Sequence, residues 1–144
     1  MYIDVSNVSI SFEENKEQHT ILNDVSLQVE KGEFICLLGP SGCGKSTLLN
    51  AMAGFLKPSS GETVEKPSMK YVTIFQNYGL LPWRSVQKNV ELGLETKKLG
   101  KEEKKKITDH YLEMVGLKEA AKKRPAQLSG GMQQRVAIAR AIVN

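Results

Sequence analysis

The chain has 144 residues, about the length of one domain, and its 40% hydrophobic and 25% charged residues are ordinary for a soluble globular protein. No apolar run approaches the roughly 18 residues of a membrane span and no signal peptide opens the sequence, so we expect membrane association only through a partner. The two cysteines form no disulfide framework and fit a reducing cytoplasm.

The net charge of +4 is concentrated in one segment. Residues 97–124 hold ten Lys/Arg against five Asp/Glu, an excess of +5, which leaves −1 for the rest of the chain. Such a segment could bind nucleic acid or an anionic membrane surface. Because its lysines are interleaved with Glu102 and Glu103, we favour a solvated helix face and expect no nucleic-acid partner.

The first thirty residues predict strands. Residues 2–5 and 8–12 alternate between apolar and polar, and alternation resumes over 21–29 after a polar loop at 13–20. We therefore expect a small, mostly antiparallel sheet at the front of the chain. The inward positions of the last run are Val25, Leu27 and Val29.

A glycine-rich loop comes next. The motif G-x-x-x-x-G-K-[ST] is matched between an apolar run at 34–38, of strand length, and a helical segment at 46–53 that Gly54 stops. Glycines let backbone N–H groups close on a polyanion at a helix N-terminus. Lys45 supplies a mobile charge for the β- and γ-phosphates, and the Ser46 hydroxyl is a ligand for Mg²⁺. This strand–loop–helix context favours nucleotide-phosphate binding over an ordinary turn. The loop residues are Gly39, Pro40, Ser41, Gly42, Cys43, Gly44, Lys45, Ser46 and Thr47.

A second buried strand is predicted at 71–75, after a turn cluster at 58–61, and it ends at Gln76. Ligands of an open α/β sheet gather beyond the carboxyl ends of its strands. We therefore expect Gln76 near the same pocket as Lys45.

From Ser85 onward the pattern becomes helical. Apolar residues recur at helical spacing in three stripes, of which the first closes at Gly100, the second closes at Gly116 and the third starts near Gly130. The stripes are Val86, Val90 and Leu94; Ile107, Tyr111, Met114 and Val115; and Val136, Ala139, Ile142 and Val143.

A second motif opens the third predicted helix, and it reads L-S-G-G-M-Q-Q-R over residues 128–135. A hydroxyl, uncovered backbone amides and a helix dipole make a second anion site, although a plain N-cap with glycines explains these residues equally well alone. Together with the phosphate loop and Gln76, in this order, the motif resembles the nucleotide-binding subunit of ATP-binding cassette (ABC) transporters. The resemblance covers essentially the whole chain.

This resemblance implies an α/β P-loop ATPase core with an N-terminal antiparallel β subdomain and a helical subdomain. Residues 1–144 would form a single, partial nucleotide-binding domain. Its β subdomain and phosphate-loop core would span 1–76, and the Q-loop, helical subdomain and signature helix would span 77–144. Family members run on beyond Asn144 into the Walker B strand, so we expect the C-terminal part of the core sheet to be missing.

The resemblance also implies ATP and Mg²⁺ as cofactors and assigns roles to the motifs. The loop 39–47 would be the Walker A loop, with Lys45 acting in catalysis. Gln76 would act in catalysis by contacting Mg²⁺ or the attacking water. Phe12 stands where the family places an aromatic that stacks on adenine, with a core strand residue as the alternative. The signature residues Ser129, Gly130 and Gly131 would bind the γ-phosphate of ATP held by a second, head-to-tail subunit.

The Walker B aspartate, the catalytic glutamate and the switch histidine of the family are expected beyond Asn144. Phosphoryl transfer depends on a positioned water and neutralised charge. Buried parallel strands also need neighbours. We therefore expect residues 1–144 alone to bind ATP weakly, to hydrolyse it very slowly and to be poorly stable.

The segment at 80–83, Leu-Leu-Pro-Trp, is similar to the nitrate/sulfonate/taurine import branch of the family. Trp83 either meets the membrane domain or closes the local core. The resemblance implies an ATP-hydrolysing importer subunit, peripheral on the cytoplasmic membrane face, that works with a permease and indirectly with a solute-binding protein. The alternatives are a nucleotide-binding remnant without hydrolysis, a soluble ABC ATPase of DNA repair or translation, and a P-loop kinase, which the signature disfavours.

Overall fold

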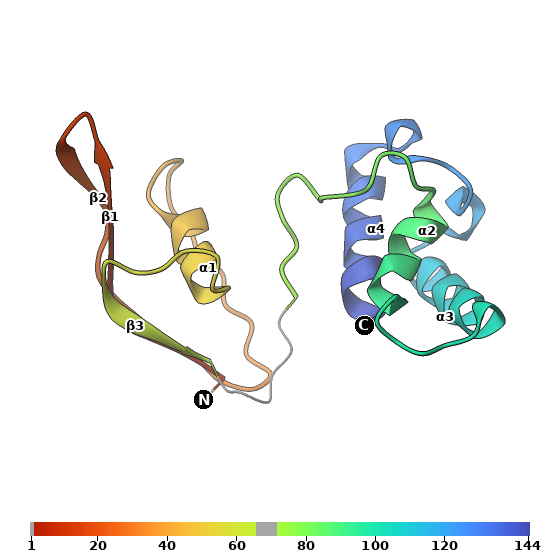
Figure 1. The fold of residues 1–144 in the computed structure, drawn as a ribbon, viewed down its shortest axis with the longest axis horizontal. Coiled ribbons are helices and arrows are strands. Elements are labelled where there is room, and N and C mark those ends of the chain that lie inside the picture. Colours follow the sequence, from red (N-terminus) through yellow and green to blue (C-terminus); the bar gives the residue numbers. More distant parts are fainter. Residues whose placement is uncertain (1, 66–71) are drawn as a thin grey trace. The chain divides into compact units, whose positions relative to one another are not determined.

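Strands and one helix occupy the first half of the chain, and helices alone occupy the second half, in the computed structural model, which describes residues 2–65 and 72–144 (Figure 1). The chain divides into two units, residues 1–71 and 72–144. No helix within the described ranges is long and apolar enough to cross a membrane.

The first unit is built on a three-stranded antiparallel sheet of order β2-β1-β3 (Figure 1). Its strands are β1 (Ile3–Glu14), β2 (Glu17–Val29) and β3 (Ser60–Glu65). The predicted antiparallel sheet is therefore confirmed. The inward positions predicted in β2 are more protected than the polar residues between them.

The polar loop predicted at 13–20 is wrong, because β1 and β2 continue through it as a hairpin. Phe12 pairs with His19 and Glu14 with Glu17, so the chain turns at Asn15 and Lys16. Both turn residues have left-handed φ values, 53° and 66°, which match the twist of a two-residue hairpin. The side chains at the hairpin tip are exposed on both faces of the sheet. The sequence there therefore lacks the alternation of apolar and polar residues that predicts a strand.

Helix α1 (Lys45–Met52) completes the core of this unit, and Gly54, with φ of 73°, follows its end as predicted. The helix buries Leu48 and Ala51, whereas Leu49 is 53% exposed. The buried cluster consists of Val5, Val8, Ile10, Leu22, Leu48 and Ala51. This packing fixes the start of α1 beside β2.

The strand predicted at 34–38 does not form. Residues 33–40 have no regular structure, and Phe34 and Leu38 are 92% and 88% exposed. The strand predicted at 71–75 is also absent over its described residues 72–75, which are irregular and exposed, while Tyr71 lies outside the described residues. A buried parallel strand requires hydrogen-bonded neighbours, and no described strand pairs with either segment.

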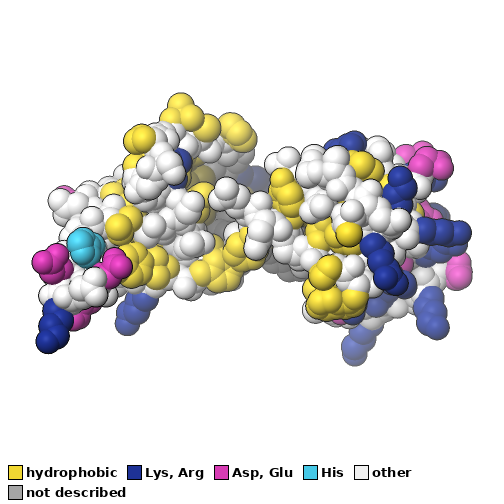
Figure 2. Space-filling view, turned by 90° about the horizontal axis from the view of Figure 1, so that it is seen from above, with side chains coloured by type: hydrophobic (Ala, Val, Ile, Leu, Met, Phe, Trp, Pro, Cys, Tyr) yellow, Lys and Arg dark blue, Asp and Glu magenta, His cyan; other side chains and the backbone are white. Residues whose placement is uncertain are grey.

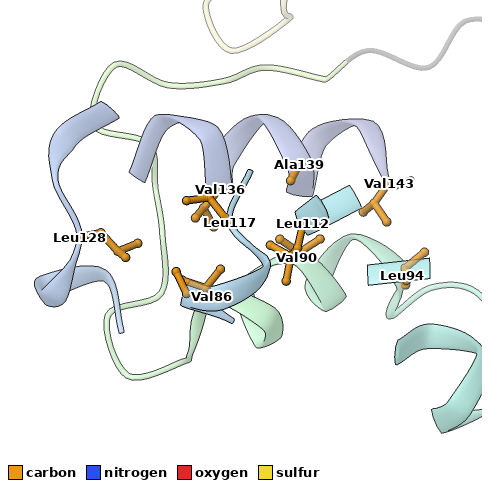
Figure 3. Close-up of a cluster of buried hydrophobic side chains, with 10 residues drawn as sticks. Val86, Val90, Leu94, Leu112, Leu117, Leu128, Val136, Ala139 and Val143 are labelled. Carbon is orange, nitrogen blue, oxygen red and sulfur yellow. The ribbon is translucent and has the colours of Figure 1, made fainter. Parts of the chain in front are cut away.

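The second unit is helical and has its own core (Figure 3). It contains α2 (Val86–Glu91), which continues into a 3₁₀ turn, η1 (Leu92–Leu94), followed by α3 (Lys101–Met114) and α4 (Gly130–Ile142). Two further 3₁₀ turns, η2 (Lys118–Ala120) and η3 (Pro125–Gln127), connect α3 to α4. Figure 3 shows side chains of α2 and η1 facing those of α4.

The predicted helical stripes are confirmed in part. The first stripe, Val86, Val90 and Leu94, is fully buried. In the other two, Met114 and Ile142 are 59% and 46% exposed and are wrong as core positions. Gly116 follows α3 with φ of 68°, as predicted, but Gly100 precedes α3 as its N-cap and does not close the first helix. The remaining buried members are Leu112, Leu117, Ala120, Leu128, Val136, Ala139 and Val143.

Candidate functional site

The glycine-rich loop of the first unit depends on backbone conformations that favour glycine. Gly42 and Gly44 have φ values of 82° and 94°. A Cβ on Gly44 would lie 2.7 Å from Leu22 Cδ2 and 3.2 Å from the Ile21 carbonyl oxygen. The loop is thereby seated directly on β2, immediately before α1 begins.

Lys45 closes the loop from the first position of α1. Its Nζ donates to the carbonyl oxygens of Gly39, at 2.9 Å, and Pro40, at 2.6 Å, and it lies 3.4 Å from Cys43 Sγ. The Lys45 side chain therefore links the start of α1 to the first two residues of the loop. A positive charge is held where the backbone amides at the start of a helix also attract anions.

Phe12 and the loop line one pocket of about 320 Å³. The Phe12 side chain comes from β1 and is 45% exposed, so it is not a core residue. One wall of the pocket is apolar and the other carries a cation and hydroxyl groups, which suits a ligand with a flat ring and a polyanion. The remaining lining residues are Ile21, Ser41, Gly42, Gly44, Lys45, Ser46 and Thr47.

These residues fit a nucleoside triphosphate with Mg²⁺. The first turn of α1 holds no acidic side chain that would repel phosphate, and Ser46 places a hydroxyl in the pocket. In the described part of the chain, no three His, Cys, Asp or Glu side chains are grouped to hold a metal ion. The Ser46 hydroxyl is an oxygen that could hold Mg²⁺ together with phosphate oxygens and water, as this ion is commonly bound.

The second motif forms a helix start in the second unit, as predicted. Ser129 is the N-cap of α4, and its Oγ accepts a hydrogen bond from the Met132 amide at 3.3 Å. Gly130 and Gly131 are exposed in the first turn, which carries no acidic side chain. The Ser129 hydroxyl caps one amide while neighbouring amides stay uncovered by side chains, as an anion site requires.

Gln76 is exposed at the start of a turn in the second unit, whereas Lys45 belongs to the first. The expected shared pocket of these two residues stays a prediction. The structure brings together Phe12 and the phosphate loop in one unit, and the Gln76 turn and Ser129 helix start in the other.

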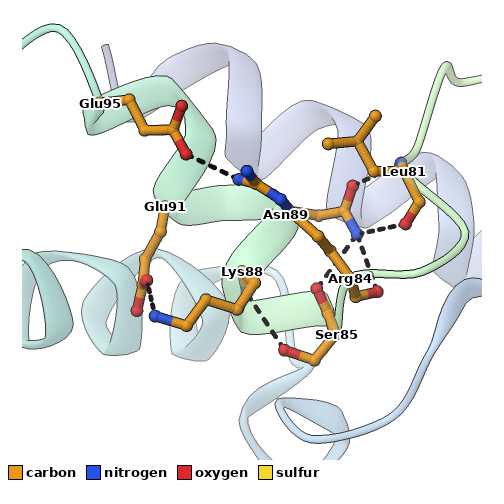
Figure 4. A network of polar contacts seen from close by, with 7 residues as sticks. All are labelled: Leu81, Arg84, Ser85, Lys88, Asn89, Glu91 and Glu95. Atoms are coloured by element: carbon orange, nitrogen blue, oxygen red, sulfur yellow. Dashed lines mark hydrogen bonds and ion pairs between the residues drawn. The ribbon is translucent and has the colours of Figure 1, made fainter.

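Sequence reasoning missed Asn89, which is fully buried in α2. Its Oδ1 accepts from the Leu81 amide at 2.8 Å, and its Nδ2 lies within 3.1 to 3.2 Å of the carbonyl oxygens of Leu81, Arg84 and Ser85 (Figure 4). One side chain thus holds both ends of the loop at 81–85. The sequence signal for this role is a polar amide residue immediately before Val90, beside the apolar stripe of the first helix.

The braced loop presents Trp83 to solvent with 68% of its side chain exposed. Of the two interpretations left open by the sequence, closure of the local core is therefore wrong. A groove of about 760 Å³ runs along Trp83, α2 and the start of α3. Arg84 pairs with Glu95 at 2.7 Å beside this groove (Figure 4).

The lysines of α3 are solvated. Lys101, Lys105 and Lys106 are exposed together with Glu102 and Glu103. Figure 2 shows Lys and Arg side chains spread over the helical unit with Asp and Glu side chains among them. This mixture agrees with the solvated helix face expected from the sequence.

A glycine loop that closes on a helix N-terminus, with Lys and Ser as the first helical residues, defines a P-loop nucleotide-binding module. The sequence comparison names the family within that class. Residues 22–144 match the family model of ABC transporters, and the chain belongs to this family.

The chain is 47% identical over 143 residues to the nitrate import ATP-binding protein NrtD of Synechococcus elongatus, covering 94% of this chain and 52% of that protein. It is 46% identical over 141 residues to the taurine import ATP-binding protein TauB of Pseudomonas aeruginosa, covering 94% and 54%. The chain thus spans about half the length of these relatives.

Solved structures of the same family have the same fold. A dimeric structure of the bacterial ABC transporter cassette MJ0796 superimposes with a TM-score of 0.88 at 37% identity, covering 99% of this chain and 69% of that one. A second dimeric structure of this cassette, in a post-hydrolysis state bound to ADP and Pi, gives 0.88 at 35% identity with the same coverage. The chain is therefore a partial P-loop ABC domain, as the sequence predicted.

Proposed function

We propose that this protein is the ATP-binding and ATP-hydrolysing subunit that powers an ABC-type importer of a small solute. The observation that carries the proposal is the pocket in which Phe12 faces the phosphate loop. The relatives named as nitrate and taurine import proteins support the importer branch, to which the Leu-Leu-Pro-Trp segment also pointed.

ATP binds with its adenine against Phe12 and its triphosphate in the loop 39–47. Lys45 leaves the carbonyl oxygens of Gly39 and Pro40 and moves to the β- and γ-phosphates, exchanging neutral acceptors for anionic ones. Ser46 would hold Mg²⁺, which would supply positive charge against the phosphate oxygens.

Two copies pair head to tail, so that Ser129, Gly130 and Gly131 of one copy bind the γ-phosphate of ATP in the other. The Ser129 hydroxyl and the backbone amides of Gly130 and Gly131 are hydrogen-bond donors at a helix N-terminus, which suits this role. Gln76 would contact Mg²⁺ or the attacking water. The pair lies at the cytoplasmic membrane face, where a permease contacts it and a solute-binding protein delivers the cargo to that permease.

A fluorescent ATP analogue titrated into the chain with Mg²⁺ tests the binding step. Lys45→Ala should weaken binding about ten-fold or more, because charge-assisted contacts with phosphate are lost. Lys57→Ala, an exposed lysine outside the pocket, is the matched control and should bind as the parent does. Equal affinity of the parent and Lys45→Ala would contradict the proposal.

Uptake of labelled nitrate, taurine and bicarbonate in cells with and without the gene tests the importer role. We expect ATP-dependent accumulation of one of these small solutes to disappear without the gene. Unchanged uptake of all three, together with an ATPase activity that DNA or ribosomes stimulate, would favour a soluble ABC protein.

A further inference from the structure

The chain makes an unusual turn directly after Gln76. Tyr78 and Gly79 both have left-handed φ values, 60° and 53°. The turn is closed locally by the Tyr78 amide, which donates to Phe75 O at 2.9 Å, and by the Gly79 amide, which donates to Asn77 O at 2.7 Å. A residue with a Cβ is disfavoured in this conformation. The conformation of Tyr78 therefore needs support from elsewhere.

Arg140 of α4 provides that support. Its Nη1 donates to the Gly79 carbonyl oxygen at 2.7 Å and its Nη2 to the Tyr78 carbonyl oxygen at 2.8 Å. The planar guanidinium fork thus binds two successive carbonyl groups, a geometry that lysine cannot copy. Partial burial lowers the pKa of Arg140 below its ordinary value, although the group stays charged at neutral pH.

The backbone at Arg140 is itself packed tightly. A Cβ on Gly93 would lie 2.6 Å from the Arg140 carbonyl oxygen and 2.6 Å from Val143 Cγ1. Gly93 therefore lets η1 lie directly against α4 at this point, next to the buried Leu94. The Arg140 side chain therefore projects from a closely packed part of α4 and not from a frayed helix end.

Tyr78 also reaches the other end of the same helix. Its hydroxyl oxygen is 4.0 Å from the position that a Cβ on Gly130 would take. The Tyr78 hydroxyl thus lies near the first turn of α4, while Arg140 binds the turn after Gln76 from the last turns of the same helix.

We propose that Arg140 is a positioning residue, which fixes the turn after Gln76 onto α4 so that this turn and the Ser129 helix start move as one body. If the proposed function holds, a displacement of the Gln76 turn is carried through Arg140 to the signature residues. Arg140 itself need not contact nucleotide.

Hydrogen exchange measured by NMR on the chain tests this proposal without nucleotide. In Arg140→Gln, the Tyr78 and Gly79 amides should exchange about ten-fold faster or more, because two charge-assisted hydrogen bonds to this turn are lost. The amides of α2 and α3 should keep their protection. Arg140→Lys should restore protection only in part, since an ammonium group cannot span both carbonyl groups.

Arg135 offers a matched control on the same helix. Its Nη1 donates to the Val115 carbonyl oxygen at 2.9 Å, so Arg135→Gln removes a bond of the same kind from a different segment. It should leave Tyr78 and Gly79 unchanged. Unchanged exchange at these two amides in Arg140→Gln would overturn the proposal. So would equal acceleration of all amides in the unit, in Arg140→Gln and Arg140→Lys alike.

Steady-state kinetics of the complete transporter separates positioning from nucleotide binding. Arg140→Lys should lower the solute-stimulated kcat while the KM for ATP stays unchanged. A raised KM with unchanged kcat would contradict a positioning role. Failure of the proposed function would appear as absent ATP binding in the parent, whereas the exchange experiment would still decide the role of Arg140.

Discussion

Asn89 and Leu81 exchange two hydrogen bonds, one in each direction, at the base of the loop that carries the only tryptophan of the chain. The Leu81 amide donates to Oδ1 at 2.8 Å, and Nδ2 donates to the Leu81 carbonyl oxygen at 3.1 Å. Since Asn89 is fully buried, the amide side chain replaces the water that these backbone groups would otherwise bind.

Replacing Asn89 by Leu should destabilise the second unit. The substitution leaves the half-buried Leu81 amide and Arg84 carbonyl oxygen without their side-chain partner, at a cost of roughly 1–3 kcal/mol. Urea unfolding followed by circular dichroism measures the loss, and Trp83 fluorescence should show a more mobile ring. Lys88→Ala on the same helix removes the ion pair of a largely exposed lysine with Glu91 and should cost less than Asn89→Leu. Equal stability of the two variants would contradict the bracing role of Asn89.

Gly61→Ala should disrupt the sheet of the first unit. Gly61 has φ of 75°, and an added Cβ would lie 2.2 Å from the Asn7 carbonyl oxygen. Because this oxygen belongs to the backbone of β1, it cannot easily move away from the added Cβ. Gly32, with φ of 79° and no atom within 4 Å of such a Cβ, is the matched control. Gly32→Ala should cost only the roughly 1 kcal/mol of a left-handed alanine. Thermal melting should place Gly61→Ala well below Gly32→Ala, and coincident melting curves would refute the close contact.

Phe12→Ala should distinguish base binding from phosphate binding. Loss of stacking on a base costs about 1–3 kcal/mol, so calorimetry should show weaker binding of ATP. Inorganic tripolyphosphate, which has no base, should bind as before. Phe34→Ala removes an aromatic that is 92% exposed and does not line the pocket, and it should leave both ligands unaffected. A parallel loss of both ligands in Phe12→Ala would show that Phe12 only shapes the loop.

Ser129 should have two separable roles. Ser129→Ala removes the cap on Met132 and should lower the stability of the second unit by about 1 kcal/mol. Ser129→Asp keeps a capping oxygen and should restore the melting temperature, but its negative charge should abolish ATP-dependent pairing of the complete subunit, measured by light scattering. ATP-dependent pairing that survives in Ser129→Asp would remove Ser129 from the γ-phosphate site.

The helical unit was largely predictable because its signals are local. The spacing of Val86, Val90 and Leu94 already defines a buried helical face, and Ser129 before two glycines already marks a helix start. The phosphate loop was predictable from the sequence for the same reason, since its glycines and Lys45 lie within nine consecutive residues.

The strands and the polar braces were less predictable because they depend on distant partners. An apolar run such as 34–38 becomes a strand only beside another strand, and no described strand pairs with it. The contacts of Arg140 with Tyr78 and Gly79 join residues about sixty positions apart, for which a single sequence holds no spacing signal.

The bare side chains of Phe34 and Leu38 have a practical consequence. An irregular stretch with aromatic and aliphatic groups in water can associate with the same stretch of another chain. Concentrated samples of residues 1–144 should therefore cluster with time, and chaperones that recognise extended apolar peptides should retain the chain through this stretch. Polar replacements at these two positions should keep the material dispersed.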